Sequence, residues 1–204
     1  MRKLANEGNA DAQFRVGYRL AFGKKGPKPR NWKEIMSWWL KAADQGLRRA
    51  KFYLGTCFDR GLGVEQDAEK AFAYFMDAAK DNFVTAQYNV AFSYREGNGV
   101  AQDLKKAVEW LIRAAKNGDE DAQRDLGYSY FHGQGIQENK IEAVRWYRKA
   151  AKAGDAKAQY NLALCYAEGE GVARMKKWEI YWLKQAANQK HVSAKKRLRQ
   201  LEVH

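Results

Sequence analysis

The sequence has few prolines and few cysteines, and each scarcity narrows what the chain can be. Pro27 and Pro29 are its two prolines in 204 residues, so almost all of the chain lacks the residue that interrupts helices most strongly. Its two cysteines, Cys57 and Cys165, are too few for a disulfide framework. Because the sequence contains no run of 18 apolar residues, it also lacks a membrane-spanning helix of ordinary length.

The net charge of +13 is spread unevenly along the chain. It is concentrated at residues 1–49 (+8) and 158–204 (+5), with a smaller excess at 122–157 (+3), whereas 50–85 (−2) and 86–121 (−1) are faintly acidic. A groove that follows a nucleic-acid backbone is expected to be basic along its whole length. The charge pattern therefore argues against such a groove. An anion or nucleic-acid binder that uses only the basic ends remains an alternative.

Internal repetition is the dominant feature of the sequence. An Ala-Ala pair recurs every 36 residues, and four Gly-x-Gly turns recur with the same period. A tryptophan or tyrosine precedes each alanine pair, at Trp38, Tyr74, Trp110, Trp146 and Trp182. A fixed period of this length is typical of an array of stacked supersecondary units.

Each repeat is predicted to contain two helices. Helix A begins near an Ala-Gln or Ala-Lys pair and ends at the first glycine of the turn, where glycine adopts the left-handed conformation at little cost. Helix B follows, and Asp67, Asp103 and Asn139 are its expected N-caps. Glycine in the middle of a helix costs about 1 kcal/mol relative to alanine, so the helix-A glycines predict that another helix backbone passes close by. On helix B, Trp110 and Trp146 are the predicted core residues.

The repeat also determines what is expected of the cysteines and of the chain's start. Cys57 and Cys165 occupy the same position three repeats apart, so they should be too distant for a disulfide and should be small buried residues, as in a reducing compartment. Residues 3–12 align with residues 149–158, so the sequence starts inside a helix B. A signal peptide or a further repeat is expected upstream. The expected location is the cytoplasm, or the periplasm if a signal peptide is removed.

The repeated residues resemble the Sel-one-like repeat, a relative of the tetratricopeptide repeat. The resemblance is carried by Ala-Gln, Leu-Gly-x-x-Tyr, Gly-x-Gly-Val-x-x-Asp and Lys-Ala-Ala-x-x-Gly. It implies an all-α, right-handed α-solenoid of stacked antiparallel helix pairs forming one domain, 1–204. The expected parts are a half-helix at 1–11, repeats at about 12–49, 50–85, 86–121, 122–157 and 158–193, and a capping helix at 191–201.

Three departures from the family pattern are visible. Residues 23–30 replace the glycine turn of the first repeat, and Met175 stands where a capping aspartate is expected. The paired cysteines of the family's cysteine-rich subset are missing, so the β-lactam-related properties of that subset are not expected here.

Nothing in the sequence predicts catalysis, a cofactor or a metal site. The histidines, His132, His191 and His204, have no metal-ligand spacing. The Gly-x-Gly turns follow helices rather than strands and lack a third glycine, which argues against a phosphate-binding loop. No serine or cysteine has a basic partner one helical turn away. The prediction is a non-catalytic protein.

The resemblance places helix A on the concave face of the solenoid and helix B on the convex face. The predicted partner-binding residues are helix-A side chains: Phe14, Tyr18, Phe52, Arg60, Tyr88, Asn89, Phe92, Arg124, Tyr128, His132, Tyr160 and Asn161. The alternative for each aromatic residue is a place in the core. Taken together, aromatics and arginines on one face have the composition of a protein-binding hot spot.

The predicted function is that of a bacterial protein-interaction scaffold or adaptor, which binds a protein or peptide in an aromatic-lined groove. The favoured oligomeric state is the monomer. An immunity protein that neutralises a secreted type VI effector toxin is the first alternative, and an anion or nucleic-acid binder with basic ends is the second. Residues 24–30, which hold four cations and both prolines, are either a tolerated insertion or a contact for an acidic partner.

Overall fold

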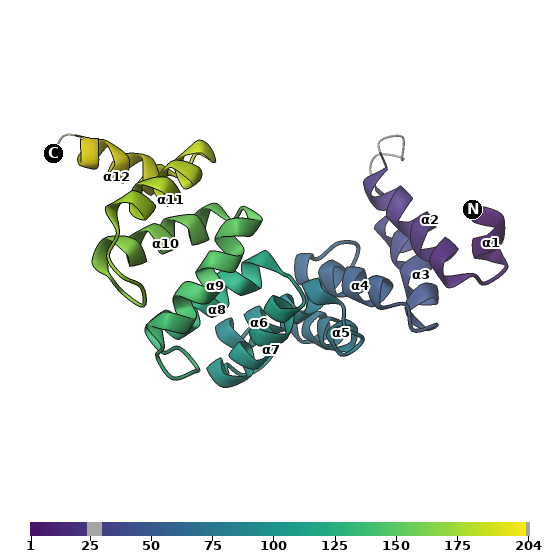
Figure 1. The fold of residues 1–204 in the computed structure, drawn as a ribbon. Helices are drawn as coiled ribbons and strands as arrows, with labels where there is room; N and C mark the ends of the chain where they lie inside the picture. Colours follow the sequence, from purple (N-terminus) through teal and green to yellow (C-terminus); the bar gives the residue numbers. More distant parts are fainter. Residues whose placement is uncertain (24–29, 203–204) are drawn as a thin grey trace. The chain divides into compact units, whose positions relative to one another are not determined.

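The computed structural model describes residues 1–23 and 30–202, and over these residues its regular secondary structure is entirely helical (Figure 1). The chain divides into two compact units, Met1–Asp103 and Leu104–His204. The segment that replaces the first glycine turn falls largely at 24–29, outside the described residues. At its end, the Arg30 guanidinium donates a hydrogen bond to the Gly23 carbonyl at 3.1 Å.

Twelve helices make up the described parts of the two units. The first unit contains α1 (Arg2–Asn6), α2 (Ala10–Phe22), α3 (Trp32–Ala43), α4 (Arg48–Arg60), α5 (Ala68–Lys80) and α6 (Val84–Glu96). The second contains α7 (Leu104–Lys116), α8 (Glu120–His132), α9 (Lys140–Ala153), α10 (Ala156–Glu168), α11 (Lys176–Asn188) and α12 (Val192–Glu202). Even-numbered helices are the predicted helices A, and odd-numbered helices are the predicted helices B. Within each unit consecutive helices pack on one another, which confirms the helix-pair packing of an α-solenoid.

Several helix ends are capped by the residues that the sequence predicts, and others are capped by residues that it did not predict. Asp67 and Asn139 accept hydrogen bonds from the amides of Lys70 and Glu142, as N-caps do. The side chain of Met175 has no oxygen that could accept such a bond, and it makes none. Helix-A N-caps that the sequence analysis did not identify are Asn9, Asp119 and Asp155. The glycines at the ends of α4, α6, α8 and α10 adopt left-handed conformations, with φ between 66° and 77°.

A ring on helix B sets how closely the two helices of a repeat approach. A Cβ atom added to Gly17 would lie 2.6 Å from Nε1 of Trp39, and one added to Gly55 would lie 2.7 Å from the Phe75 ring. The carbonyls of Ile35 and Ala71 would lie 3.2 Å from the same two added atoms. The close passage of a helix backbone is therefore confirmed, but the aromatic ring is the tighter constraint.

The helix-B side chain that packs against the small residue of helix A lies one position after the predicted core tryptophan. At the filled position the side chains are at most 5% exposed, and they are Trp39, Phe75, Leu111, Tyr147 and Leu183. Trp110, one residue earlier, is 8% exposed, so its predicted burial is confirmed. Trp146 is only half-buried, and its prediction as a core residue is wrong. Successive helical residues point about 100° apart, so the residue before the filled position lies at the edge of the buried face.

The size of the small residue on helix A follows the size of this core residue. Glycine occurs in the repeats that use Trp39, Phe75 and Tyr147, whereas alanine occurs at 91 and 163 in the repeats that use Leu111 and Leu183. Leucine is smaller than these rings, so it leaves space for one methyl group on the facing helix. This exchange of volume keeps the helix pair at interior packing density.

A buried glutamine links each repeat to the one before it. The side-chain amide of the Ala-Gln pair donates to the carbonyl of the second alanine of the preceding helix B. The four bonds of this kind are Gln13 to Ala5, Gln87 to Ala79, Gln123 to Ala115 and Gln159 to Ala151, at 3.1 to 3.3 Å. In the second repeat Lys51 replaces the glutamine and pairs with Asp77 and Asp81 instead. Burial lowers the pKa of Lys51, but the hydrogen bond to Asp81, with Asp77 adding to it, outweighs this effect and raises the pKa.

In two repeats a second glutamine donates a hydrogen bond to the side-chain oxygen of the buried glutamine, and in a third repeat this second glutamine is missing. Gln45 and Gln189 donate to the side-chain oxygens of Gln13 and Gln159, at 2.9 and 3.1 Å. Ala153 stands at the equivalent position of the fourth repeat. The buried Oε1 atom of Gln123 has no hydrogen-bond partner among the described residues. The missing glutamine accounts for this unsatisfied acceptor.

Both cysteines are buried, as predicted. Burial raises the pKa of the Cys57 thiol to about 11 and that of the Cys165 thiol to about 12. Both thiols are therefore neutral at physiological pH, which is the state of small core residues rather than of nucleophiles.

The ring contact predicts a compensating pair of substitutions. Gly55→Ala should destabilise the protein by about 1–3 kcal/mol because its methyl group would overlap the Phe75 ring, and Phe75→Leu should destabilise it by leaving a cavity. The double variant should be more stable than the sum of the two changes predicts, by about 1 kcal/mol. Urea denaturation of the four proteins measures this coupling, and strict additivity would contradict the proposed exchange of volume.

The unsatisfied glutamine predicts a stabilising substitution. Ala153→Gln should supply a donor to Oε1 of Gln123 and raise the free energy of unfolding by about 1 kcal/mol, seen as a higher melting temperature. The matched control is the same change in a Gln123→Leu background, where no acceptor remains. A gain of equal size in both backgrounds would show that the stabilisation has another source.

Candidate protein-binding surface

The predicted partner-binding residues fall into three classes of exposure. Exposed residues are Tyr18, Arg60, Phe92, Tyr128 and His132. Half-buried residues are Phe52, Tyr88, Asn89, Arg124, Tyr160 and Asn161. Phe14 is buried. The seventh position of helix A presents an exposed aromatic ring in three of the five repeats, as Tyr18, Phe92 and Tyr128, and holds Thr56 and Leu164 in the other two.

The expected exposure of Phe14 is wrong. Its side chain belongs to the core of the first unit, and its ring lies 5.6 Å from the Tyr53 ring and 6.4 Å from the Trp39 ring. The third position of helix A points toward helix B, so a large side chain there packs inside the repeat. Only the edge of Phe14 contributes to the surface.

Arg124 is held by three carboxylates and acts within the protein. Its guanidinium pairs with Asp121 at 2.5 Å, with Asp125 at 2.9 Å and with Asp155 at 2.8 Å. Asp155 is also the N-cap of α10, so the arginine ties α8 to the start of the next helix A. Burial lowers the pKa of Arg124, but the neighbouring carboxylates, led by Asp125, more than offset this effect, and the net shift is upward. The expectation of an exposed Arg124 is therefore wrong.

A pocket of about 470 Å³ opens on the helix-A side of the first unit, and we call it the arginine pocket. Its wall consists of Met1, Phe14, Arg15, Tyr18, Arg19, Arg49, Tyr53 and Phe83. The aromatic part is preorganised by ring contacts: Tyr18 meets Tyr53 edge-on at 5.7 Å and Phe22 at 4.9 Å. Burial raises the pKa of Tyr53, so its hydroxyl stays protonated.

The arginine pocket is positively charged. Arg49 pairs with Asp11 at 2.6 Å and lies over the Phe14 ring, with 5.1 Å from its guanidinium carbon to the ring centre. Arg15 and Arg19 form no ion pair within the described part of the chain. An apolar wall edged by unpaired arginines suits an aromatic or aliphatic side chain that has an acidic neighbour.

Sequence reasoning predicted only part of this pocket. Tyr18 was selected by its position on helix A, but Arg19, Arg49 and Phe83 were not. Arg49 precedes the Ala-Lys pair and Phe83 lies just before α6, so neither belongs to the helix-A positions that the family resemblance implies. The excess of positive charge over residues 1–49, which include Arg19 and Arg49, was the one available signal, and it does not extend to Phe83.

A second pocket, of about 360 Å³, lies in the second unit, and we call it the histidine pocket. It is lined by Tyr128, Phe131, His132, Tyr147, Asn161, Leu164, Glu168 and Glu170. The rings of Tyr128 and His132 are in contact, tilted by 48° with 4.2 Å between their centres. Burial raises the pKa of Tyr147, which opposes its ionisation. Three predicted residues, Tyr128, His132 and Asn161, are thus brought together.

The remaining predicted residues do not join either pocket. Tyr160 stacks on His191, with 4.8 Å between the ring centres, and Phe52 packs against Phe83 and Phe75. Phe92 is 42% exposed on α6, with the Arg95 guanidinium carbon 5.3 Å from its ring centre.

The described residues offer neither a metal site nor a membrane-spanning helix. Across residues 1–23 and 30–202, no three His, Cys, Asp or Glu side chains gather in an arrangement that could hold a metal ion. None of the described helices has the length and apolar character needed to cross a membrane.

Comparison with known families and structures gives one consistent result. The Sel1 repeat model matches residues 10–47, 48–82, 84–119, 120–155, 156–176 and 180–191. Proteins with these repeats are in general non-catalytic scaffolds for protein interactions. Comparison with curated protein sequences gave no significant match.

Solved structures agree with the family match. A Sel1 repeat protein from Oxalobacter formigenes is 35% identical, with a TM-score of 0.88 over 98% of this chain and 58% of its own. The protective antigen c5321 of uropathogenic Escherichia coli is 33% identical, with a TM-score of 0.89 over 92% of this chain and 40% of its own. This chain therefore spans about half the length of these two proteins.

A more distant structure shares the fold. The immunity protein Pa5087 from Pseudomonas aeruginosa is 23% identical, with a TM-score of 0.55 over 91% of this chain and 67% of its own. Because the family model covers most of the sequence and two structures exceed 30% identity, the chain belongs to the Sel1 repeat family.

Proposed function

We propose that this protein is a non-catalytic scaffold that binds a peptide segment of a partner protein on the helix-A side of its repeats. The arginine pocket carries the proposal, because it combines an apolar wall with two arginines, Arg15 and Arg19, that have no ion-pair partner within the described residues. Aromatic side chains and arginine are the residues most enriched at the centres of protein interfaces.

The chemistry of the pocket specifies the kind of segment. An aromatic or aliphatic side chain would enter between Tyr18 and Phe83, and an adjacent aspartate or glutamate would pair with Arg15 or Arg19. Arginine binds carboxylates through two parallel hydrogen bonds, which adds orientation to affinity. The preferred ligand is therefore an acidic segment with one large apolar residue.

Each unit has a further exposed aromatic residue at the seventh helix-A position. Phe92 and Tyr128 are 42% and 44% exposed, and a partner that covers them would remove their apolar surface from water. They lie in different units, so each is expected to contribute on its own.

The adaptor and immunity roles are versions of the same binding mechanism and differ in the identity of the partner. The 23% identity to the immunity protein Pa5087 supports a shared fold alone. Purification of the partner from the source organism separates the two roles: a secreted toxin as the bound protein would specify immunity, and an assembly component would specify an adaptor.

The basic-end alternative concerns other residues. Lys24, Lys25 and Lys28 lie outside the described residues, and Lys195 and Lys196 are exposed on α12. An anion binder of that kind would depend steeply on salt and little on the aromatic side chains.

The pocket predicts a pattern of peptide selection. Peptides selected from a displayed random library should combine an acidic residue with a neighbouring aromatic or large aliphatic one. Tyr18→Ala should weaken the best peptide by about 30-fold, because loss of a central interface aromatic costs about 2 kcal/mol. Arg15→Ala combined with Arg19→Ala should remove the preference for the acidic residue.

The control for this experiment is Tyr181→Ala, which removes a tyrosine of almost equal exposure, 44% against 43% for Tyr18, from α11. Isothermal titration should show unchanged affinity for that variant. Equal losses at Tyr18 and Tyr181, or selected peptides without acidic residues, would contradict the assignment of the pocket.

A further inference from the structure

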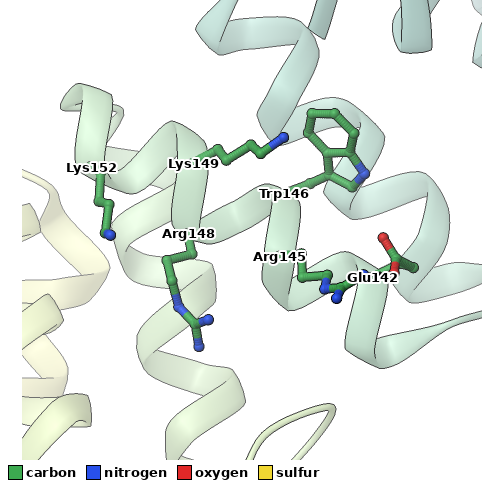
Figure 2. Close-up of a pocket in the computed structure, with 6 residues that line it drawn as sticks. All are labelled: Glu142, Arg145, Trp146, Arg148, Lys149 and Lys152. Atoms are coloured by element: carbon green, nitrogen blue, oxygen red, sulfur yellow. Dashed lines mark hydrogen bonds and ion pairs between the residues drawn. The ribbon is translucent and has the colours of Figure 1, made fainter. Parts of the chain in front are cut away.

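A basic stripe runs along α9, on a surface that shares no residue with either pocket. It consists of Arg145, Arg148, Lys149 and Lys152, which are spaced so that all four fall on one helical face. Together with Glu142 and Trp146 they line a depression of about 380 Å³. Figure 2 shows these six side chains along successive turns of the helix, with Lys149 beside the Trp146 ring and Glu142 next to Arg145.

Carboxylates within the protein neutralise little of this stripe. Glu142 pairs with Arg145 at 2.5 Å. Arg148 donates to the Tyr166 hydroxyl at 3.2 Å, and the Lys149 ammonium lies 4.0 Å from the centre of the Trp146 ring. Lys152 makes no ion pair in the described parts of the chain. Three of the four cations are thus available to an external carboxylate.

The stripe is not a requirement of the repeat. Like charges four residues apart on a helix repel, and the stripe contains two such pairs, Arg145 with Lys149 and Arg148 with Lys152. The equivalent positions of every other repeat hold at most two cations. The charge pattern therefore opposes the stability of α9, and the other repeats form the same helix pair without it.

We propose that the basic stripe and Trp146 form a second docking surface, which binds an acidic segment of a protein partner. The stripe extends over seven residue steps, about 10 Å at 1.5 Å per residue. An extended chain covers that distance in about three residues. A run of three or four glutamates or aspartates would therefore match the cations, with an apolar side chain placed in the depression against Trp146.

Nucleic acid and anionic membranes fit these features less well. A protein that holds duplex DNA makes about 6–10 phosphate contacts, far more than one stripe of this length provides. An anionic membrane surface would meet the cations but would place no side chain in the depression against Trp146.

Fluorescence anisotropy of a labelled peptide tests the proposal. The probe is a short peptide with four consecutive glutamates and one phenylalanine, and its control has glutamines in place of the glutamates. Arg148→Glu combined with Lys152→Glu should weaken binding by about tenfold at physiological salt. Lys195→Glu combined with Lys196→Glu makes the same change in net charge at two exposed lysines of the same unit and should weaken it less than twofold.

Three further measurements make the result decisive. Circular dichroism melting establishes that each variant is folded, and Arg148→Gln with Lys152→Gln should give an intermediate loss if charge is the cause. Because the arginine pocket is expected to bind the same kind of peptide, the charge reversal on α9 is also measured in an Arg15→Ala, Tyr18→Ala and Arg19→Ala background, where the tenfold loss should persist and so keep the two surfaces separate. Equal losses for the two charge reversals would overturn the proposal. So would stripe-dependent binding of an oligo-dT strand or of phosphatidylserine vesicles without binding of the peptide.

Discussion

The hydrogen bond from a buried glutamine to the last turn of the preceding helix B is the interaction on which the repeat array depends. The last carbonyls of a helix have no partner within the helix, and here a turn amide and the glutamine of the next repeat share one of them, as at Ala151. The bond thus satisfies a helix end and fixes where the next helix begins. The glutamine occurs in four of the five repeats, and in the second repeat Lys51 takes its place and forms ion pairs with Asp77 and Asp81 instead.

The second constraint operates inside each repeat. Helices usually pack 8–10 Å apart, and a ring facing a glycine, as Phe75 faces Gly55, fills that gap without a void. Other helix-A side chains, such as Leu54 and Leu126, are also buried in this core, whereas Tyr18 and Tyr128 at the seventh position face solvent. The surface available for binding is therefore a consequence of how the core is filled.

Periodicity alone predicted the helices, the turns and the glycine C-caps, because these depend on residues close in sequence, but it missed the N-caps Asn9, Asp119 and Asp155. Periodicity could not predict which of Trp146 and Tyr147 is buried, since the two adjacent residues differ only by a rotation about the helix axis. The buried residue is the one that faces a glycine on another helix, here Gly127. Nor could periodicity predict the arginine pocket, whose residues Arg49 and Phe83 come from different repeats. Arg124 shows the reverse case: its residue type suits an interface, but Asp121 and Asp125 on its own helix pair with it, and the fold adds Asp155 from the next repeat.

The tryptophan one residue before the buried helix-B side chain shows how a repeat protein can have two separate binding faces. In three repeats this tryptophan carries a cation one turn later: Lys41 over Trp38, Arg113 over Trp110 and Lys149 over Trp146. The cation shields the exposed side of the indole and holds it against the helix, so a tryptophan can remain at the edge of the core. Substitutions beside such a covered ring change the charge of the outer surface without opening the core. The helix-B face can therefore acquire a basic stripe in a single repeat while the helix-A face keeps its aromatic residues.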